Sequence, residues 1–233
     1  MRPRALLPLV ALLLCVTAAV AVPAVDARAP PTPVCGVCDL DRTTPSGDPV
    51  VAGESSLTVT VHENGSTTWL ARADLTAGGD ALAANDSLRD AVASEAAADG
   101  IADPRDVDAR LDGDALVVEY RDPGAAERSV GTVVFTPLTP ASPNAPMVSG
   151  GEGGRYLAAD RLTVRAGSGL AIHGAAPTTD SGDRLVWTPT AIGGGDAVRP
   201  SLDVARDPVA IGEGALLPGV RAWAARRLVG NTL

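Results

Sequence analysis

The sequence of 233 residues contains no lysine, so arginine supplies all 19 of its basic side chains. A P-loop is excluded, because its phosphate-binding element needs a lysine next to Ser or Thr. The 28 acidic residues give a formal net charge of −9, and the chain has no block of basic residues. Such a chain repels phosphate, and we therefore expect no nucleic-acid partner.

Aromatic residues make up only 3% of the chain, and there are two histidines and three cysteines. The chain is therefore not a disulfide-dense miniprotein, and its 45% of hydrophobic residues must build a core mainly from Val, Leu and Ala. The two histidines, His62 and His173, have no G-x-S-x-G motif to accompany them, which disfavours a serine hydrolase. We expect no catalytic, cofactor-binding or metal site, and we do not expect an enzyme.

Aspartate dominates the acidic residues, with 21 Asp against seven Glu. Short carboxylates hold water and hydrated cations in concentrated salt, where the Debye length falls to roughly 3 Å at 1 M. The composition predicts a halophilic protein, and GC-rich coding is the alternative explanation. The run of aspartates from Asp99 to Asp114 suggests a calcium site. Arg110, however, stands where an EF-hand loop would need an oxygen ligand, so a solvated acidic face is the favoured interpretation.

Residues 1–24 have the layout of a signal peptide. Arg2 and Arg4 precede an uncharged, largely apolar stretch, and small residues around Ala21 and Ala24 offer cleavage sites. The uncharged run also approaches the length of a spanning helix, so an uncleaved anchor is the alternative. The layout predicts an exported protein that is either extracellular or membrane-anchored and facing outside.

Residues 25–55 are predicted to be a proline-rich spacer that carries the CGVC motif. Because export implies an oxidising compartment, the leading interpretation of Cys35 and Cys38 is a structural disulfide. A thiol-redox or metal-binding pair is the alternative, although Asp39 and Asp41 oppose thiolate formation and zinc would need two more ligands. We expect this motif to lie outside the folded body, which is predicted to begin near residue 56.

Residues 56–138 are predicted to form an α+β domain, a mainly antiparallel sheet with one short helix in the order β-β-α-β-β-β. Asn64-Gly65 separates two alternating runs and predicts a hairpin with a two-residue turn. That turn pairs Val59 with Leu70. It places four residues on one buried face, namely Leu57, Val59, Val61 and Leu70.

A second hairpin is predicted to turn at Gly113 and Asp114, which pairs Leu111 with Leu116. Between the two hairpins, apolar residues at helical spacing predict a helix over residues 87–98.

The later part of the chain shows less regular patterns. After a strand at residues 130–136, residues 139–154 are predicted to be a Pro/Gly-rich linker or loop. Residues 155–214 are predicted to form a smaller β-rich unit packed on the first sheet, and residues 215–233 an amphipathic helix and tail. The apolar stripe of this helix is expected to pack on the domain, with an interfacial membrane contact as the alternative. The stripe consists of Leu217, Val220, Trp223, Ala224 and Leu228.

Four segments in this order resemble a known family: CGVC after an export signal, SLTVTVHENGSTTWLARADL, LDGDALVVEYRDPG and YLAADRLTVRAG. Over about residues 35–166, the chain resembles a family of uncharacterised haloarchaeal exported or membrane-associated proteins. The resemblance implies an envelope location and the same fold. It supplies no activity and no catalytic residue.

These observations favour a non-enzymatic envelope or extracellular domain, a structural or binding module whose partner is an unknown envelope protein or surface polymer. An exported thiol-redox or metal-handling protein that uses Cys35 and Cys38 is the alternative. Membrane contact through the N-terminal segment or the C-terminal helix stays open. Two sequons, at Asn64 and Asn85, fall at predicted surface turns and are expected glycosylation sites, although a turn and a helix start also explain these residues.

We predict that stability depends on salt. Loss of residues 1–24, which hold two arginines and no acid, changes the formal charge from −9 to −11. When salt is diluted, the carboxylates repel one another over longer distances and destabilise the folded state. The thermal midpoint should therefore fall between molar and tens of millimolar NaCl, and an unchanged midpoint would show that the acidic bias is only compositional.

Overall fold

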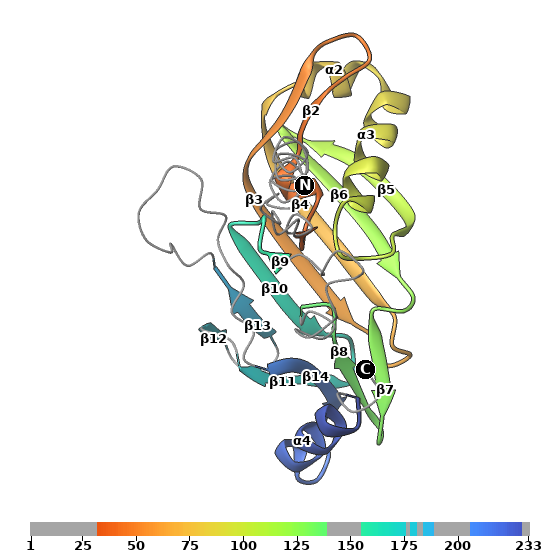
Figure 1. The fold of residues 1–233 in the computed structure, drawn as a ribbon, viewed down its shortest axis with the longest axis vertical. Helices are drawn as coiled ribbons and strands as arrows, with labels where there is room; N and C mark the ends of the chain where they lie inside the picture. The colour runs from red at the N-terminus through yellow and green to blue at the C-terminus, as the bar shows by residue number, and fades with distance from the viewer. Residues whose placement is uncertain (1–31, 139–154, 176–177, 181–183, 189–205, 230–233) are drawn as a thin grey trace, which may run out of the picture.

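The computed structural model describes residues 32–138, 155–175, 178–180, 184–188 and 206–229 (Figure 1). In chain order, its elements are β1 (Thr32–Pro33), the 3-10 helix η2 (Val37–Asp39), β2 (Asp41–Thr43), β3 (Pro49–Val61), β4 (Thr67–Ala77), α2 (Gly79–Ala84), α3 (Asp86–Ala98), β5 (Arg105–Asp112), β6 (Ala115–Asp122), β7 (Ala126–Ser129), β8 (Thr132–Phe135), β9 (Arg155–Tyr156), β10 (Arg161–Ala166), β11 (Leu170–Ala175), β12 (Thr178–Asp180), β13 (Arg184–Trp187), β14 (Arg206–Gly212) and α4 (Pro218–Val229).

Most strands belong to two sheets. The larger sheet has eight strands in the order β12-β13-β10-β3-β4-β6-β5, with β2 also paired to β3. The smaller sheet has four strands in the order β11-β14-β8-β7, and β1 and β9 form a short parallel pair. Within the two sheets, every pairing is antiparallel except that of β10 with β3. The α+β class and the predominance of antiparallel strands are as predicted.

One face of the larger sheet carries the core. Alternate residues of its central strands point to this inner face, which is covered by α3 and η2 (Figure 1). Each of these inner residues is at most 1% exposed: Leu57, Val59, Val61, Trp69, Ala71, Ala73, Leu116, Val118, Tyr120, Leu162 and Val164.

Trp69 connects this core to the smaller sheet. Its ring centroid lies 5.9 Å from that of Tyr120 on β6 and 5.9 Å from that of Phe135 on β8. Its indole N–H donates a hydrogen bond to Thr67 Oγ1 at 2.7 Å, so the one polar atom of the side chain is satisfied. Half of the six aromatic residues in the chain therefore meet at the junction of the two sheets.

The first hairpin has a different register from the prediction. Val59 lies opposite Trp69, not Leu70, and the loop has three residues, Glu63–Gly65, closed by a 2.9 Å hydrogen bond from His62 N–H to the Ser66 carbonyl. Within that loop only Gly65 has a positive φ, of 85°, as in a type I turn followed by a bulge. The shift by one residue turns Leu70 outward and Trp69 into the core.

The second hairpin and the helix agree with the prediction. Leu111 lies opposite Leu116, and Asp112 and Ala115 flank the two turn residues. The helix is α3, and its N-cap is Asn85, whose side chain accepts a 3.1 Å hydrogen bond from Leu88 N–H.

The predicted start of the folded body near residue 56 is wrong. β3 begins at Pro49, and the CGVC segment contacts β3, β4 and α3. Val34, Cys35 and Val37 are fully buried, because their apolar side chains help to cover the inner face of the larger sheet. The predicted signal segment, residues 1–24, and the predicted linker, residues 139–154, lie outside the described residues.

The strands of residues 155–214 do not form a separate unit. β10, β13 and β12 extend the larger sheet, whereas β11 and β14 complete the smaller sheet that β7 and β8 begin. β14 was not predicted, because its consecutive residues Val209, Ala210 and Ile211 are all buried and show no alternation.

The C-terminal helix is present as α4, but the predicted buried stripe is wrong. Ala222, Ala225 and Val229 are buried against the smaller sheet, whereas Val220 and Trp223 are 58% and 60% exposed. Small side chains let the helix approach the sheet closely, and this turns the bulky side chains toward solvent. None of the described helices combines the length and the hydrophobicity needed to cross a membrane.

We predict that Gly65→Ala destabilises the protein more than Gly47→Ala. Both glycines have positive φ, 85° and 94°, so each substitution should cost about 1 kcal/mol from backbone strain. A Cβ at Gly65 would also lie 2.9 Å from the Ala126 carbonyl oxygen of β7, whereas at Gly47 no atom lies within 4 Å. Urea denaturation should show a further loss of about 1–3 kcal/mol at Gly65, as expected for overpacking. Equal costs would contradict the close approach of β7.

Candidate functional site

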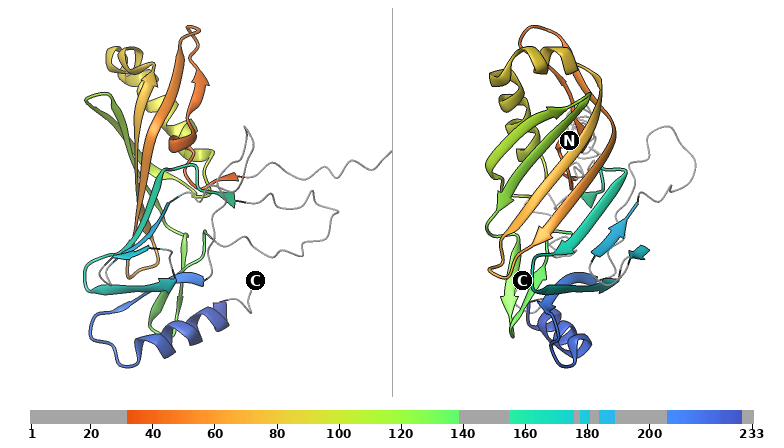
Figure 2. Two further views of the ribbon diagram at one scale, coloured as in Figure 1. Left: turned by 90° about the vertical axis from the view of Figure 1, so that its left-hand side faces the viewer. Right: turned by 180° about the vertical axis from the view of Figure 1, so that it is seen from behind.

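The outer face of the larger sheet is open to solvent. In the right-hand panel of Figure 2, β5, β6, β4, β3 and β10 lie in front, and no described helix covers them. The side chains on this face are the alternate residues that the core does not use.

Arginines are concentrated on this face in rungs, where a rung is a row of residues directly opposite one another on neighbouring strands. Three successive rungs cross β10, β3, β4, β6 and β5: Arg161–Ser56–Arg72–Val117–Arg110, Thr163–Thr58–Leu70–Glu119–Asp108, and Arg165–Thr60–Thr68–Arg121–Arg105. These rungs hold six arginines and two carboxylates, although acids outnumber bases 28 to 19 in the whole chain. We call these six arginines, all exposed, the arginine face.

Most of the arginine face is not neutralised by ion pairs. Arg72 pairs with Asp112 at 2.6 Å and Arg105 with Asp103 at 2.8 Å. The other four form no ion pair with any described residue, namely Arg110, Arg121, Arg161 and Arg165. These guanidinium groups are therefore available to an anionic ligand.

Two pairs of arginines lie directly opposite each other. Arg121 faces Arg105 between β6 and β5, and Arg165 faces Arg184 between β10 and β13. Like charges at such positions destabilise a sheet. In the first pair Arg105 already has Asp103 as an ionic partner, and an anion bound beside Arg121 would weaken the remaining repulsion.

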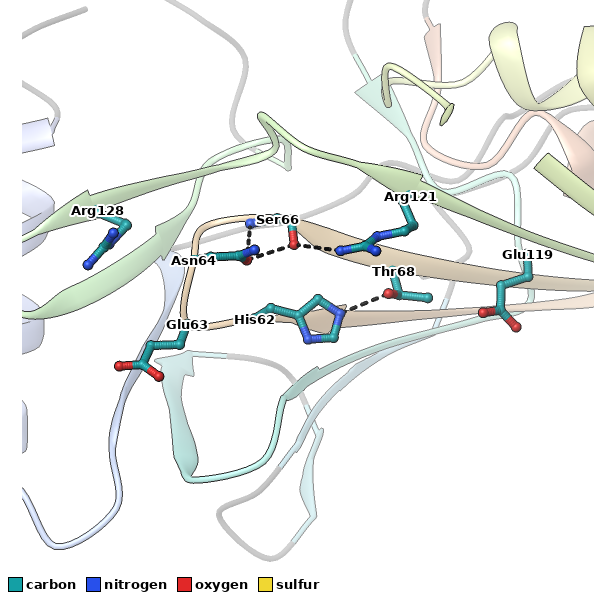
Figure 3. Close-up of a pocket in the computed structure, with 8 residues that line it drawn as sticks. All are labelled: His62, Glu63, Asn64, Ser66, Thr68, Glu119, Arg121 and Arg128. Atoms are coloured by element: carbon teal, nitrogen blue, oxygen red, sulfur yellow. Dashed lines mark hydrogen bonds between the residues drawn. The ribbon is translucent and has the colours of Figure 1, made fainter. Parts of the chain in front are cut away.

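A groove of about 650 Å³ lies at one end of the arginine face (Figure 3). Arg121 points toward the β3–β4 loop, where its Nη2 lies 3.5 Å from Ser66 Oγ. Glu63, Glu119 and Arg128 also line the groove and form no ion pair with a described residue. The full lining is His62, Glu63, Asn64, Ser66, Thr68, Glu119, Arg121 and Arg128.

His62 contributes a neutral imidazole to the groove. Burial, and to a smaller degree the positive charge of Arg121, lowers its pKa below the ordinary value of 6.5. Its Nε2 forms a 2.8 Å hydrogen bond with Thr68 Oγ1, whereas the Ser66 hydroxyl donates to Asn64 Oδ1 at 2.7 Å. Ser66 and His62 therefore do not form the nucleophile–base hydrogen bond of a hydrolase.

The groove and the arginine face can bind a polar ligand by charge-assisted and neutral hydrogen bonds. No group of three or more His, Cys, Asp or Glu suited to a metal ion occurs in the described part of the chain.

The structure joins Cys35 and Cys38 by a disulfide in the core. Their exposed fractions are 0% and 6%, and Cys35 Sγ accepts a 3.1 Å hydrogen bond from Cys38 N–H. A Cβ on the intervening Gly36 would lie 2.1 Å from the Ala96 carbonyl at the end of α3, so only glycine permits this close packing. Because thiol exchange needs an accessible sulfur, this location favours a structural role over a redox role.

The two sequons lie at the surface. Asn64 is exposed, and its Oδ1 accepts a hydrogen bond from Ser66 N–H at 3.0 Å as well as that from the Ser66 hydroxyl. Asn85 is exposed and caps α3. Both asparagines thus have structural roles, and their glycosylation stays a prediction.

Comparison of the chain with models of protein families, with curated proteins and with solved structures finds no match. The resemblance to haloarchaeal exported proteins therefore stays a prediction.

The arginine face was not predicted from the sequence. Its arginines are scattered between residues 72 and 165, and none belongs to a motif. Arg161 and Arg165 occupy alternate outward positions of a short run, which is a visible signal. Only the parallel pairing of β10 with β3, however, places that run beside Ser56 and Thr60.

We predict that Cys35→Ala/Cys38→Ala lowers the free energy of unfolding by about 2 kcal/mol. The chain-entropy relation gives this value for a loop closed between residues three apart in sequence. Urea denaturation under non-reducing conditions measures the loss. Native protein that reacts with a thiol-alkylating reagent at Cys35 or Cys38 would contradict the disulfide, and an unchanged stability would contradict its structural role.

Proposed function

We propose that this chain is an exported, non-enzymatic binding module of a halophile's envelope, and that the arginine face holds an anionic surface polymer. The chemical class of the ligand is a polysaccharide with carboxylate or sulfate groups. The groove at His62 and Arg121 takes one of its sugar units.

The observation that carries this proposal is the set of four arginines that form no ion pair with a described residue, on an open sheet and in a chain where acids predominate. Neighbouring strands lie about 4.8 Å apart, and alternate residues of a strand about 6.7 Å apart. The arginine face therefore presents charges at regular intervals over an extended area. This arrangement fits a chain of anionic units better than a single small ion.

The uncharged residues of the rungs favour a saccharide over a nucleic acid. Serine and threonine hydroxyls, which donate and accept hydrogen bonds with sugar hydroxyls, occupy five positions of the three rungs: Ser56, Thr58, Thr60, Thr68 and Thr163. None of the three rungs includes an aromatic side chain for base stacking, and Trp69 and Tyr120 point to the core.

The disulfide supports the exported location, because disulfides persist mainly in oxidising compartments. The thiol-redox alternative has less support, since both sulfurs are buried.

The test is to compare binding of the full chain, purified from a halophilic host, to alginate, dextran sulfate and neutral dextran in 1 M NaCl. Arg121→Gln/Arg165→Gln should raise the dissociation constant for a charged polymer about tenfold, because two charge-assisted contacts are lost. Arg221→Gln/Arg227→Gln makes the same charge change on α4, and it should alter the constant by less than about twofold.

Three outcomes would contradict the proposal. In the first, the chain binds none of the polymers. In the second, it binds neutral dextran as tightly as it binds the charged polymers. Alternatively, double-stranded DNA in the same assay would bind more tightly than alginate, which would make the arginine face a nucleic-acid site.

A further inference from the structure

Bulky apolar side chains are exposed together at the C-terminal end of the fold. Among the described residues, six large hydrophobic side chains are exposed, and five of them lie within residues 216–228: Leu216 at 81%, Leu217 at 71%, Val220 at 58%, Trp223 at 60% and Leu228 at 52%. The sixth is Val130, at 59%. We call Leu216, Leu217, Val220 and Trp223 the C-terminal ridge.

Packing of α4 does not need the C-terminal ridge. The helix is held by Ala222, Ala225 and Val229 on its opposite side. Arg226 adds two hydrogen bonds to the body, from Nε to the Asp207 carbonyl at 2.7 Å and from Nη2 to the His173 carbonyl at 3.0 Å. The ridge is therefore presented on a firmly attached helix.

The backbone is strained at Leu217, a residue of the ridge that directly precedes α4. Leu217 has φ of 52°, a conformation that a bulky residue rarely adopts. Its carbonyl accepts hydrogen bonds from Val220 N–H at 3.0 Å and Arg221 N–H at 3.1 Å, which start the helix. Strain of this kind persists only where the surrounding structure requires it, and is often found at binding sites.

The charge of this segment is opposite to that of the whole chain. Residues 214–233 contain three arginines and no acid, although the chain carries −9. Arg227 lies over the Trp223 ring, 6.0 Å from its centroid, and Arg221 is exposed beside the ridge. Tryptophan next to arginine on an apolar helix face is typical of helices that lie in a membrane interface.

We propose that the C-terminal ridge docks on an anionic lipid surface. Leu217, Val220 and Trp223 enter the boundary between headgroups and acyl chains, while Arg221 and Arg227 contact the lipid phosphates. This attachment is independent of the polymer site on the larger sheet.

The position and charge of α4 favour a lipid surface over a second copy of the chain. α4 forms one end of the molecule in all three views, so a flat surface reaches it without meeting the sheets (Figures 1 and 2). In a second copy, residues 214–233 would bring three more arginines and no Asp or Glu side chain to pair with them.

The tryptophans allow a direct test on the full chain. Trp69 and Trp187 are 0% and 1% exposed, so of the three tryptophans only Trp223 can reach lipid. Vesicles with brominated acyl chains, made of phosphatidylglycerol and phosphatidylcholine, should quench on the order of a third of the fluorescence. Trp223→Phe should abolish the quenching and retain vesicle binding. Quenching of Trp223 is the decisive readout because it reports on α4, whereas cosedimentation would also detect binding through residues 1–24.

Matched variants separate the apolar and the ionic contributions. Val220→Ser should raise the vesicle concentration needed for half-maximal quenching about three- to tenfold. Val130 is equally exposed but lies on the β7–β8 turn, so Val130→Ser should change that concentration by less than about twofold. Arg221→Gln/Arg227→Gln should weaken binding to the anionic vesicles severalfold.

Three results would overturn the proposal. Trp223 would stay unquenched in anionic vesicles, or pure phosphatidylcholine would quench it equally well. In the third case, Trp223 would be shielded from iodide before lipid is added, which would mean that the ridge is already covered. Light scattering would then show whether a second copy of the chain or another segment of the same chain covers it.

Discussion

The packing of Trp69 between Tyr120 and Phe135 joins the two sheets, and the rest of the structure depends on it. The chain has only six aromatic residues, and three of them meet at this junction. Because side chains alternate along a strand, burial of Trp69 requires its neighbours Thr68 and Leu70 to point outward. The same alternation across the paired strands turns Arg121 and Arg165 to the open face. The core thus decides the composition of the proposed binding surface.

The fold brings arginines together in an acidic chain. The three rungs on the outer side of the larger sheet hold six arginines and two carboxylates, and α4 adds three more arginines. An acidic protein in concentrated salt can tolerate arginines opposite one another, because screening weakens their repulsion. The two proposals place a polymer on the sheet and a lipid surface at the far end of the molecule. A module with these two contacts would link a membrane to an anionic polymer outside it.

Local features were predicted well, and features that depend on distant partners were not. The Gly113 turn and α3 follow from residues within a few positions of each other, and both predictions are confirmed. Asn64-Gly65 fits both a two-residue and a three-residue loop, and only burial of Trp69 selects the longer one. The face of α4 was predicted from its bulky residues, yet the residues buried against the sheet are Ala222, Ala225 and Val229. Of the groove residues, Asn64 was predicted to lie at a surface turn, whereas no motif in the sequence pointed to Arg121.

By itself, the sequence determined the fold class, the positions of most strands and the excess of acids, because alternation, turn residues and composition are local or summed properties. The tertiary structure alone decided which face of each strand is buried, that CGVC belongs to the core, and that six arginines from four strands form one surface. The physical reason is the two-residue period of a strand. A shift of one residue in pairing exchanges the two faces, and contacts between residues up to about a hundred positions apart decide that shift.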